Sequence, residues 1–302
     1  MSGTTASICR RALVLLGAAT LAESVILRVR AAEDRDEKRH KILVFTKSSG
    51  FEHEPVKQGQ DLSLAEKTLA SIGERHGFGV VVTKDGRAFD GDLTQYNAFF
   101  FFTTGDLTEA GTDGHPPMSA AGKEALIAAI RAGKGFIGIH SASDTFHSKG
   151  AAFETQVRTD PYIAMLGGEF ISHGSQQQAR VQVVDPQFPG LRGLAEGFQI
   201  TEEWYSLKNF APDIHVLLVL ETEGMRDSEY RRPPFPLAWA RKEGKGRVYY
   251  NAIGHREDVW TSERFQEMLA GAVAWVTAVA DADLSANMSK VTPRARAMPP
   301  AK

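Results

Sequence analysis

Four histidines in this chain stand next to small residues at or just beyond the ends of apolar stretches. They are His53 in SSGFEHEP, His140 at the end of GFIGIH, His173 in GGEFISHG and His255 at the end of YYNAIGH. Imidazole exchanges protons near neutral pH and is a common metal ligand. A single histidine in such a place is usually satisfied by a backbone group in a loop or core. Four in the same context predict a shared site.

A pair of carboxylates, Glu202 and Glu203, stands directly before two aromatic residues, Trp204 and Tyr205. An aromatic ring can stack on the apolar face of a sugar, and a carboxylate can accept sugar hydroxyl protons or act as a general acid or base. Trp260 is a second candidate for stacking. Buried tryptophans beside solvated glutamates would give the same pattern. We take Glu203 as an acid/base candidate and the three aromatic residues as substrate-binding candidates.

The elements that must position these side chains follow from the hydrophobic pattern. Short buried runs at 41–46, 79–83, 98–103 and 135–140 alternate with amphipathic segments, as expected for strands covered by helices on both faces. This order predicts an α/β fold with a mostly parallel, doubly wound sheet. Ligands bind at the carboxyl ends of strands in such sheets, and the four histidines stand at such points.

The second half of the chain continues the sheet less regularly. Strand-like stretches occur at 179–185, 215–221, 235–241 and 248–253, and a final helix begins near residue 261. We expect some of these strands to be antiparallel extensions of the sheet.

Composition excludes several functions. The 302 residues include 35 Lys and Arg against 37 Asp and Glu, for a net charge of −2. This balance argues against nucleic-acid binding, which needs a concentrated basic face, and favours a neutral small-molecule partner. The one cysteine, Cys9, lies in the predicted leader. The rest of the chain therefore has no disulfide, thiolate metal site or cysteine nucleophile.

The ends of the chain are expected to lie outside the fold. Residues 1–32 predict a signal peptide, with two arginines before an apolar run too short to span a bilayer. If it is cleaved, the protein is exported to the periplasm or beyond and has no transmembrane segment; otherwise it is cytoplasmic. Residues 33–40 predict a charged linker, 41–280 a single domain, and 281–302 a disordered Pro-rich tail. Nothing in the pattern indicates an oligomeric state.

Several runs together carry a resemblance to a known family. They are GFEH (50–53), IGIHSASDTF (137–146), GGEFISHG (167–174), EEWYSLKN (202–209) and PLAWARKEGKGRVYYNAIGHREDVW (236–260). The chain resembles the ThuA-like family of trehalose-utilisation proteins over the whole expected domain. The resemblance implies a flavodoxin-like three-layer sandwich similar to class I glutamine amidotransferases, and a role in carbohydrate utilisation. Within these runs Asp144 is a further candidate for substrate binding.

Two positions depart from the family pattern. Glu202 stands where an aspartate is usual, and Phe188 stands where the family often has a histidine. The related amidotransferases carry a cysteine at the tight turn after a strand and activate it with a downstream His-x-Glu pair. Here that turn carries His140, although His255 and Glu257 keep the His-x-Glu spacing. Without a thiol, glutamine hydrolysis through a thioester is not available.

The first functional hypothesis is a hydrolase or lyase that acts on a disaccharide or a 3-keto glycoside. The acid/base groups would be His140, His173, His255 and Glu203, and His53 would help to bind the substrate. One version places a divalent metal, Zn or Mn, among His53, His140, His173, His255 and Glu203. Neutral imidazoles and a carboxylate suit these ions, although no short motif such as HExxH is present.

Two alternatives remain open at this point. One is a non-catalytic sugar-binding or scaffold domain that keeps the pocket without the chemistry. The other is an ester or amide hydrolase that works through His255 and Glu257.

Overall fold

The computed structural model describes residues 39–301. The predicted signal peptide and most of the predicted linker lie outside the described residues. No helix within 39–301 is long and apolar enough to cross a membrane.

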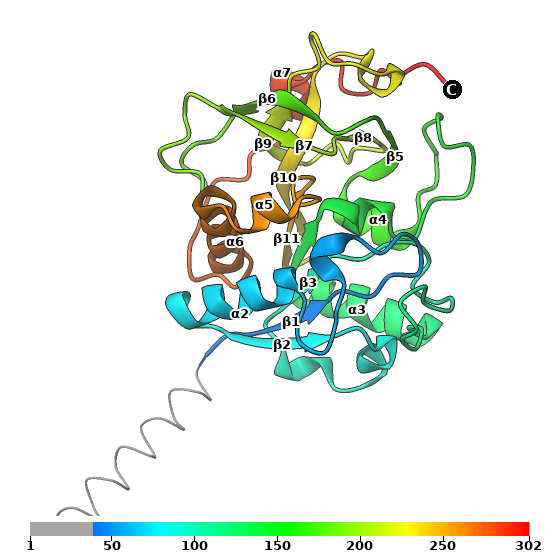
Figure 1. The fold of residues 1–302 in the computed structure, drawn as a ribbon, viewed down its shortest axis with the longest axis vertical. Helices are drawn as coiled ribbons and strands as arrows, with labels where there is room; N and C mark the ends of the chain where they lie inside the picture. Colours follow the sequence, from blue (N-terminus) through cyan, green and yellow to red (C-terminus); the bar gives the residue numbers. More distant parts are fainter. Residues whose placement is uncertain (1–38, 302) are drawn as a thin grey trace, which may run out of the picture. The chain divides into compact units, whose positions relative to one another are not determined.

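A nine-stranded sheet forms the centre of the described chain (Figure 1). Its strands, in spatial order, are β2 (Gly79–Thr83), β1 (Lys41–Phe45), β3 (Ala98–Phe101), β4 (Gly135–Ile139), β11 (Gly246–Asn251), β10 (Phe235–Glu243), β9 (His215–Leu220), β6 (Gln177–Val183) and β7 (Phe198–Glu202). The five strands from β2 to β11 are parallel, in the order of a flavodoxin-like sheet. The other four extend the sheet in antiparallel fashion. The predicted α/β fold class is confirmed.

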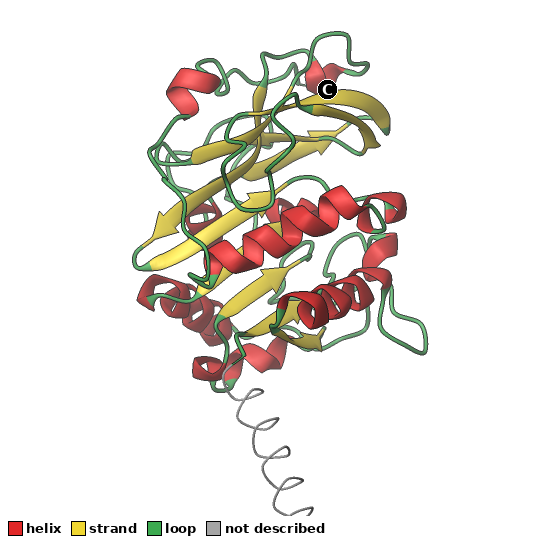
Figure 2. Cartoon of the chain, turned by 90° about the vertical axis from the view of Figure 1, so that its left-hand side faces the viewer, coloured by secondary structure: helices red, strands yellow, loops and turns green. Residues whose placement is uncertain are grey.

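Helices cover both faces of the parallel part and complete three layers. They are α2 (Leu64–His76), α3 (Ala120–Ala132), α4 (Pro161–Leu166), α5 (Glu257–Trp260), α6 (Glu263–Val276) and α7 (Met288–Val291). In Figure 1, α2 and α6 lie to the left of the central strands, whereas α3 and α4 lie to the right. Figure 2 shows that most of the helices gather around the lower half of the sheet, while the upper half is mostly strands and loops.

Short elements connect the main ones. A second sheet pairs β5 (Glu169–His173) with β8 (Tyr205–Lys208). Single 3-10 turns are η1 (Glu54–Val56), η2 (Gly86–Asp90), η3 (Leu93–Gln95), η4 (His140–Asp144) and η5 (Ser228–Tyr230).

The helix boundaries follow from local sequence. α2 begins with a capping box, in which the Ser63 hydroxyl accepts from the Glu66 backbone and the Glu66 carboxylate accepts from the Ser63 backbone. α3 begins after Ser119, whose side chain accepts from the Gly122 N–H, and it ends at Gly133 in a positive-φ conformation. These signals were readable in the sequence because each involves residues one turn apart.

The C-terminal segment differs from the predicted disordered tail. Residues 281–301 include α7, and Met288 and Ala295 are buried. Asn287 pairs with both backbone groups of Val216 in β9, and the buried Arg232 guanidinium donates to the Ala295 carbonyl at 2.6 Å. Specific hydrogen bonds and buried side chains such as Met288, Thr292 and Ala295 order this segment. Its polar, Pro-rich composition predicted disorder, because composition does not reveal specific contacts of this kind.

Candidate functional site

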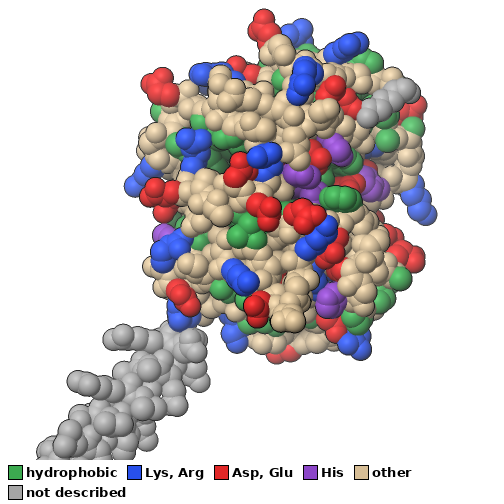
Figure 3. Space-filling view, viewed as in Figure 1, with side chains coloured by type: hydrophobic (Ala, Val, Ile, Leu, Met, Phe, Trp, Pro, Cys, Tyr) green, Lys and Arg blue, Asp and Glu red, His purple; other side chains and the backbone are tan. Residues whose placement is uncertain are grey.

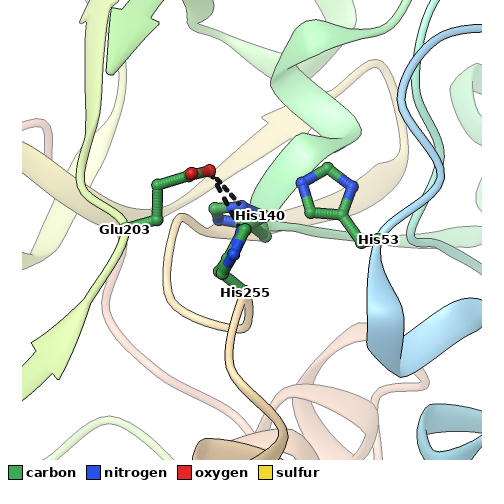
Figure 4. A group of neighbouring side chains, drawn as sticks. All are labelled: His53, His140, Glu203 and His255. Carbon is green, nitrogen blue, oxygen red and sulfur yellow. Dashed lines mark ion pairs between the residues drawn. The ribbon is translucent and has the colours of Figure 1, made fainter. Parts of the chain in front are cut away.

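Four side chains from distant parts of the sequence meet at the carboxyl edge of the sheet. His53 follows β1, His140 follows β4, His255 follows β11, and Glu203 lies in the turn between β7 and β8. One ligand atom from each lies within 4.8 Å of all the others. Figure 4 shows Glu203 and His53 on opposite sides of His140 and His255. The location is the one expected for a ligand site in an open α/β sheet.

The distances are those of a compact polar cluster. Glu203 Oε2 lies 3.0 Å from His255 Nδ1 and 3.5 Å from His140 Nε2. The ring centroid of His53 lies 4.9 Å from that of His140 and 5.2 Å from that of His255. His53 and His140 are buried, whereas Glu203 and His255 keep some exposure toward solvent.

The hydrogen bonds of His140 define which of its ring nitrogens is available. Nδ1 lies 2.8 Å from the carbonyl oxygen of Ala252, so Nδ1 carries the proton and donates. In a neutral ring Nε2 then holds a lone pair that points toward Glu203. A histidine that donates one ring N–H to a backbone carbonyl and directs the other nitrogen into a site is the usual arrangement of a metal-ligating histidine.

Three buried ring nitrogens in the cluster have no hydrogen-bond partner in the described structure: His53 Nδ1, His140 Nε2 and His255 Nδ1. The 3.0 Å contact between His255 and Glu203 is an ion-pair distance that is not aligned as a hydrogen bond. An unpaired buried polar atom costs about 1–3 kcal/mol, and such atoms are uncommon in native structures. Two of them, His140 Nε2 and His255 Nδ1, face the same oxygen of Glu203 and are positioned as potential metal ligands.

The electrostatics leave the cluster with a charged carboxylate and at least one neutral ring. Burial by itself raises the pKa of Glu203, but the rings of His140 and His255 outweigh it and the pKa lies well below its usual range. Burial, together with the neighbouring His140 and His255, lowers the pKa of His53 to about 2. An ionised carboxylate and neutral imidazoles are the forms in which these groups bind metal ions.

The turn that carries His140 is the strained turn expected from the sequence. His140 has φ 46°, a left-handed conformation that is uncommon outside glycine. Its carbonyl oxygen accepts from the Tyr250 hydroxyl at 2.7 Å. Backbone strain of this kind is often found at functional sites, where the surrounding structure enforces it.

The position of His255 depends on two residues that hold the preceding Gly254. Glu202 Oε2 accepts from the Gly254 N–H at 3.0 Å, and Trp260 Nε1 donates to the Gly254 carbonyl at 2.8 Å. Glu202 also accepts from the Glu203 N–H at 2.8 Å. Burial raises the pKa of Glu202. Glu202 therefore positions both Glu203 and His255, a role that its sequence neighbourhood did not reveal.

His173 and Tyr205 border the cluster in different ways. His173 is half-exposed, and its Nδ1 lies 3.3 Å from Glu203 Oε1. Tyr205 is buried, with its ring 4.1 Å from that of His140 and its hydroxyl 3.4 Å from His53 Nε2. Histidine side chains are visible together on the face shown in Figure 3. His173 thus stands at the mouth of the site, and Tyr205 supports its interior.

Two predicted stacking residues have a different role. Trp204 and Trp260 are both fully buried, and the Trp204 indole donates to the Gln177 carbonyl at 2.7 Å. Neither ring offers a face to a ligand, because core packing covers both; they are structural.

Glu257 is exposed at the start of α5 and forms no ion pair or hydrogen bond with His255 within residues 39–301. His255 faces Glu203 instead, which removes the basis for the ester or amide hydrolase.

Comparison with known proteins places the fold. The ThuA family model, described as trehalose utilisation, matches residues 41–276. A ThuA-like protein from Bacteroides uniformis ATCC 8492 is 21% identical with a TM-score of 0.53, and the match covers 79% of this chain and 91% of that one. One from Parabacteroides merdae ATCC 43184 is 16% identical with a TM-score of 0.57, covering 82% and 92%. No curated protein matches the chain.

Proposed function

Since the chain belongs to the ThuA family of trehalose utilisation, we propose that it is a carbohydrate-utilisation enzyme, a hydrolase or lyase of a disaccharide or 3-keto glycoside. The observation that carries the proposal is the cluster of His53, His140, His255 and Glu203 at the carboxyl edge of the sheet, in which the unpaired His140 Nε2 and His255 Nδ1 both face the Glu203 carboxylate. A scaffold has no need of unpaired buried nitrogens, which lower stability unless a ligand satisfies them.

The cluster fits a divalent metal, Zn or Mn, held by His53, His140, His255 and Glu203. Neutral imidazoles with a carboxylate suit either ion. Of the five predicted ligands, His173 lies outside this set, because its ring approaches the other oxygen of Glu203. When bound, the ion would polarise a carbonyl or hydroxyl oxygen of the sugar.

His173 is the group best placed to move protons. It is half-exposed at the mouth, next to Glu203, whereas His53 and His140 are buried. On a 3-keto glycoside, a base removes the proton from the carbon next to the ketone, the bond from the adjacent anomeric carbon to the leaving oxygen breaks, and an acid protonates that oxygen. Water added across the resulting double bond would complete a hydrolysis. His173 would act as the base or the acid in this sequence.

The site does not support amidotransferase chemistry. The strained turn carries His140, and the sole cysteine of the chain is Cys9. Acyl transfer through a thioester needs a thiol at that turn. We propose that the fold shared with glutamine amidotransferases serves sugar chemistry here.

The test combines metal analysis with a turnover screen. The full chain, metal-loaded or chelated, is assayed on disaccharides and their 3-keto forms. We expect about one metal ion per chain and turnover that chelation abolishes, with both lost in His140→Ala and kept in His76→Ala, which removes an exposed histidine on α2. Metal-free protein with full activity would exclude the metal. Sugar binding without turnover on any substrate would favour the non-catalytic binding domain.

The predicted leader adds a separate proposal about location. We propose that residues 1–32 direct export of the protein. Fractionation of cells that express the full chain, with N-terminal sequencing of the product, tests this; an intact N-terminus in the cytoplasmic fraction contradicts it.

A further inference from the structure

A second polar group lies beside the metal-ligating cluster and is not explained by it. His147 bridges two carboxylates: its Nε2 lies 2.5 Å from Asp144 Oδ1, and its Nδ1 lies 3.3 Å from Glu169 Oε1. Asp144 ends the same short turn, η4, that begins with His140. His147 follows no strand, so its position in the sequence gives no signal of a functional role.

Glu169 serves to fix His147 and is not free for a ligand. It is fully buried, and it accepts from the Ser148 N–H at 3.0 Å, the Ser148 hydroxyl at 2.6 Å and the Asn209 side chain at 2.7 Å. All of its oxygen capacity is therefore used inside the protein. Hydrogen bonds to Asp144 and Glu169 raise the pKa of His147 to about 9, so the ring is an imidazolium at neutral pH.

Asp144 has one oxygen held and one available. Its Oδ1 is held by His147, whereas no hydrogen bond to Oδ2 occurs among residues 39–301, and the side chain is 25% exposed. With Lys208 3.9 Å from Glu169, the group contains two negative and two positive charges. Because this group has no net charge, we expect its available carboxylate oxygen to accept a hydrogen bond from a hydroxyl of an uncharged ligand rather than to bind a cation.

An aromatic platform connects this group to the metal-ligating cluster. The half-buried Phe170 ring lies 6.1 Å from the ring of His173, 6.4 Å from that of His147 and 4.2 Å from that of the buried Tyr205. Phe170 and His173 are three residues apart and would point to opposite faces of a regular strand. A register shift in β5 between Phe170 and Ser172 brings both rings together.

We propose that Phe170, Asp144 and His147 form a second sugar subsite, which binds the ring of the substrate that does not react. That ring would stack on Phe170 while its hydroxyls donate to Asp144 Oδ2, and the reacting ring would lie at His173 and Glu203. This inference rests on the proposed function and narrows it: the substrate is a disaccharide or a glycoside with a second ring, not a monosaccharide.

The test compares disaccharides with monosaccharides in the full-length chain. Trehalose, maltose and their 3-keto forms are titrated by calorimetry against glucose and 3-ketoglucose. We expect at least one disaccharide to bind about tenfold tighter than its monosaccharide. Asp144→Asn and Phe170→Ala should each remove about tenfold of that affinity and leave monosaccharide binding unchanged. Phe170→Tyr retains an aromatic ring at this position and should bind disaccharides with wild-type affinity. The comparison with Phe170→Ala distinguishes the loss of stacking from a general effect on folding.

Glu223→Gln, which removes an exposed carboxylate in the loop after β9, is the matched control and should bind as wild type. If Asp144→Asn and Phe170→Ala bind disaccharides as tightly as wild type, or weaken both classes of sugar equally, the subsite is wrong. Metal-dependent turnover that persists in that case leaves the proposed function intact. If wild-type protein binds no sugar and turns over none, the subsite and the proposed function both fail.

Discussion

We predict that binding of Mn or Zn to the cluster raises the melting temperature of the protein by a measurable amount. Among residues 39–301, two buried ring nitrogens that face Glu203, His140 Nε2 and His255 Nδ1, have no hydrogen-bond partner, each at a cost of about 1–3 kcal/mol. A ligand that binds only the folded state at 100 times its Kd stabilises by about 2.7 kcal/mol. For a domain of this size each kcal/mol corresponds to about 2–4 °C in Tm, so Mn or Zn should raise Tm by about 5–10 °C.

Removal of one ligand should largely abolish this shift. His140→Ala removes Nε2 from the cluster, and we expect the affinity for the ion to fall about 100-fold or more. At the same metal concentration the ion would then be near its Kd, where it stabilises by only about 0.4 kcal/mol. The shift in Tm should drop to about 1 °C.

Differential scanning fluorimetry of chelated protein, with and without each ion, measures both values. His76→Ala should keep the full shift, because that histidine is exposed on α2 and belongs to no cluster. Wild-type protein that shows no shift with either ion, or an equal shift in wild type and His140→Ala, would refute the reasoning that the unpaired nitrogens are metal ligands.

Three further predictions concern groups around the site. Glu202→Gln replaces one of the two carboxylate oxygens that accept the backbone N–H groups of Glu203 and Gly254. We expect the variant to lose about 1–3 kcal/mol of unfolding free energy, measured in urea, and to turn over substrate more slowly because Gly254 is displaced. Unchanged stability and unchanged turnover would contradict the positioning role. The pKa of His147 in the folded protein, about 9, lies above its unfolded value near 6.5. The stability that charged His147 contributes should therefore be fully present below about pH 6.5 and be lost as pH rises through about 9. Unfolding of wild type and His147→Gln from pH 6 to 10 should show a stability difference that shrinks with pH; a difference that grows would contradict this. Truncation after residue 280 exposes the apolar surface that Met288 covers and removes the Ala295 carbonyl that accepts from Arg232. We expect it to lower the unfolding free energy by about 2–4 kcal/mol. A truncated chain as stable as the full one would show that the tail contributes nothing.

The sequence determined the architecture and the edge of the sheet where the site lies. Buried runs such as GFIGIH and helix signals such as Ser63 with Glu66 involve neighbours within a turn or along one strand. Such local patterns predict elements, and their alternation predicts a parallel sheet whose carboxyl ends face one way. This was enough to predict that His53, His140 and His255 share an edge of the sheet, without any knowledge of their distances.

The direction of each side chain was decided only by the tertiary structure. Trp204 stands between Glu203 and Tyr205 in the sequence, yet it turns into the core, because strand pairing and packing fix which way each residue points. The bulge in β5 and the turn after His140 bring Phe170 and His147 into one surface that no local period predicts. Glu203 meets His53 across 150 residues of chain, and contacts of that kind depend on how the antiparallel extension packs against the parallel strands.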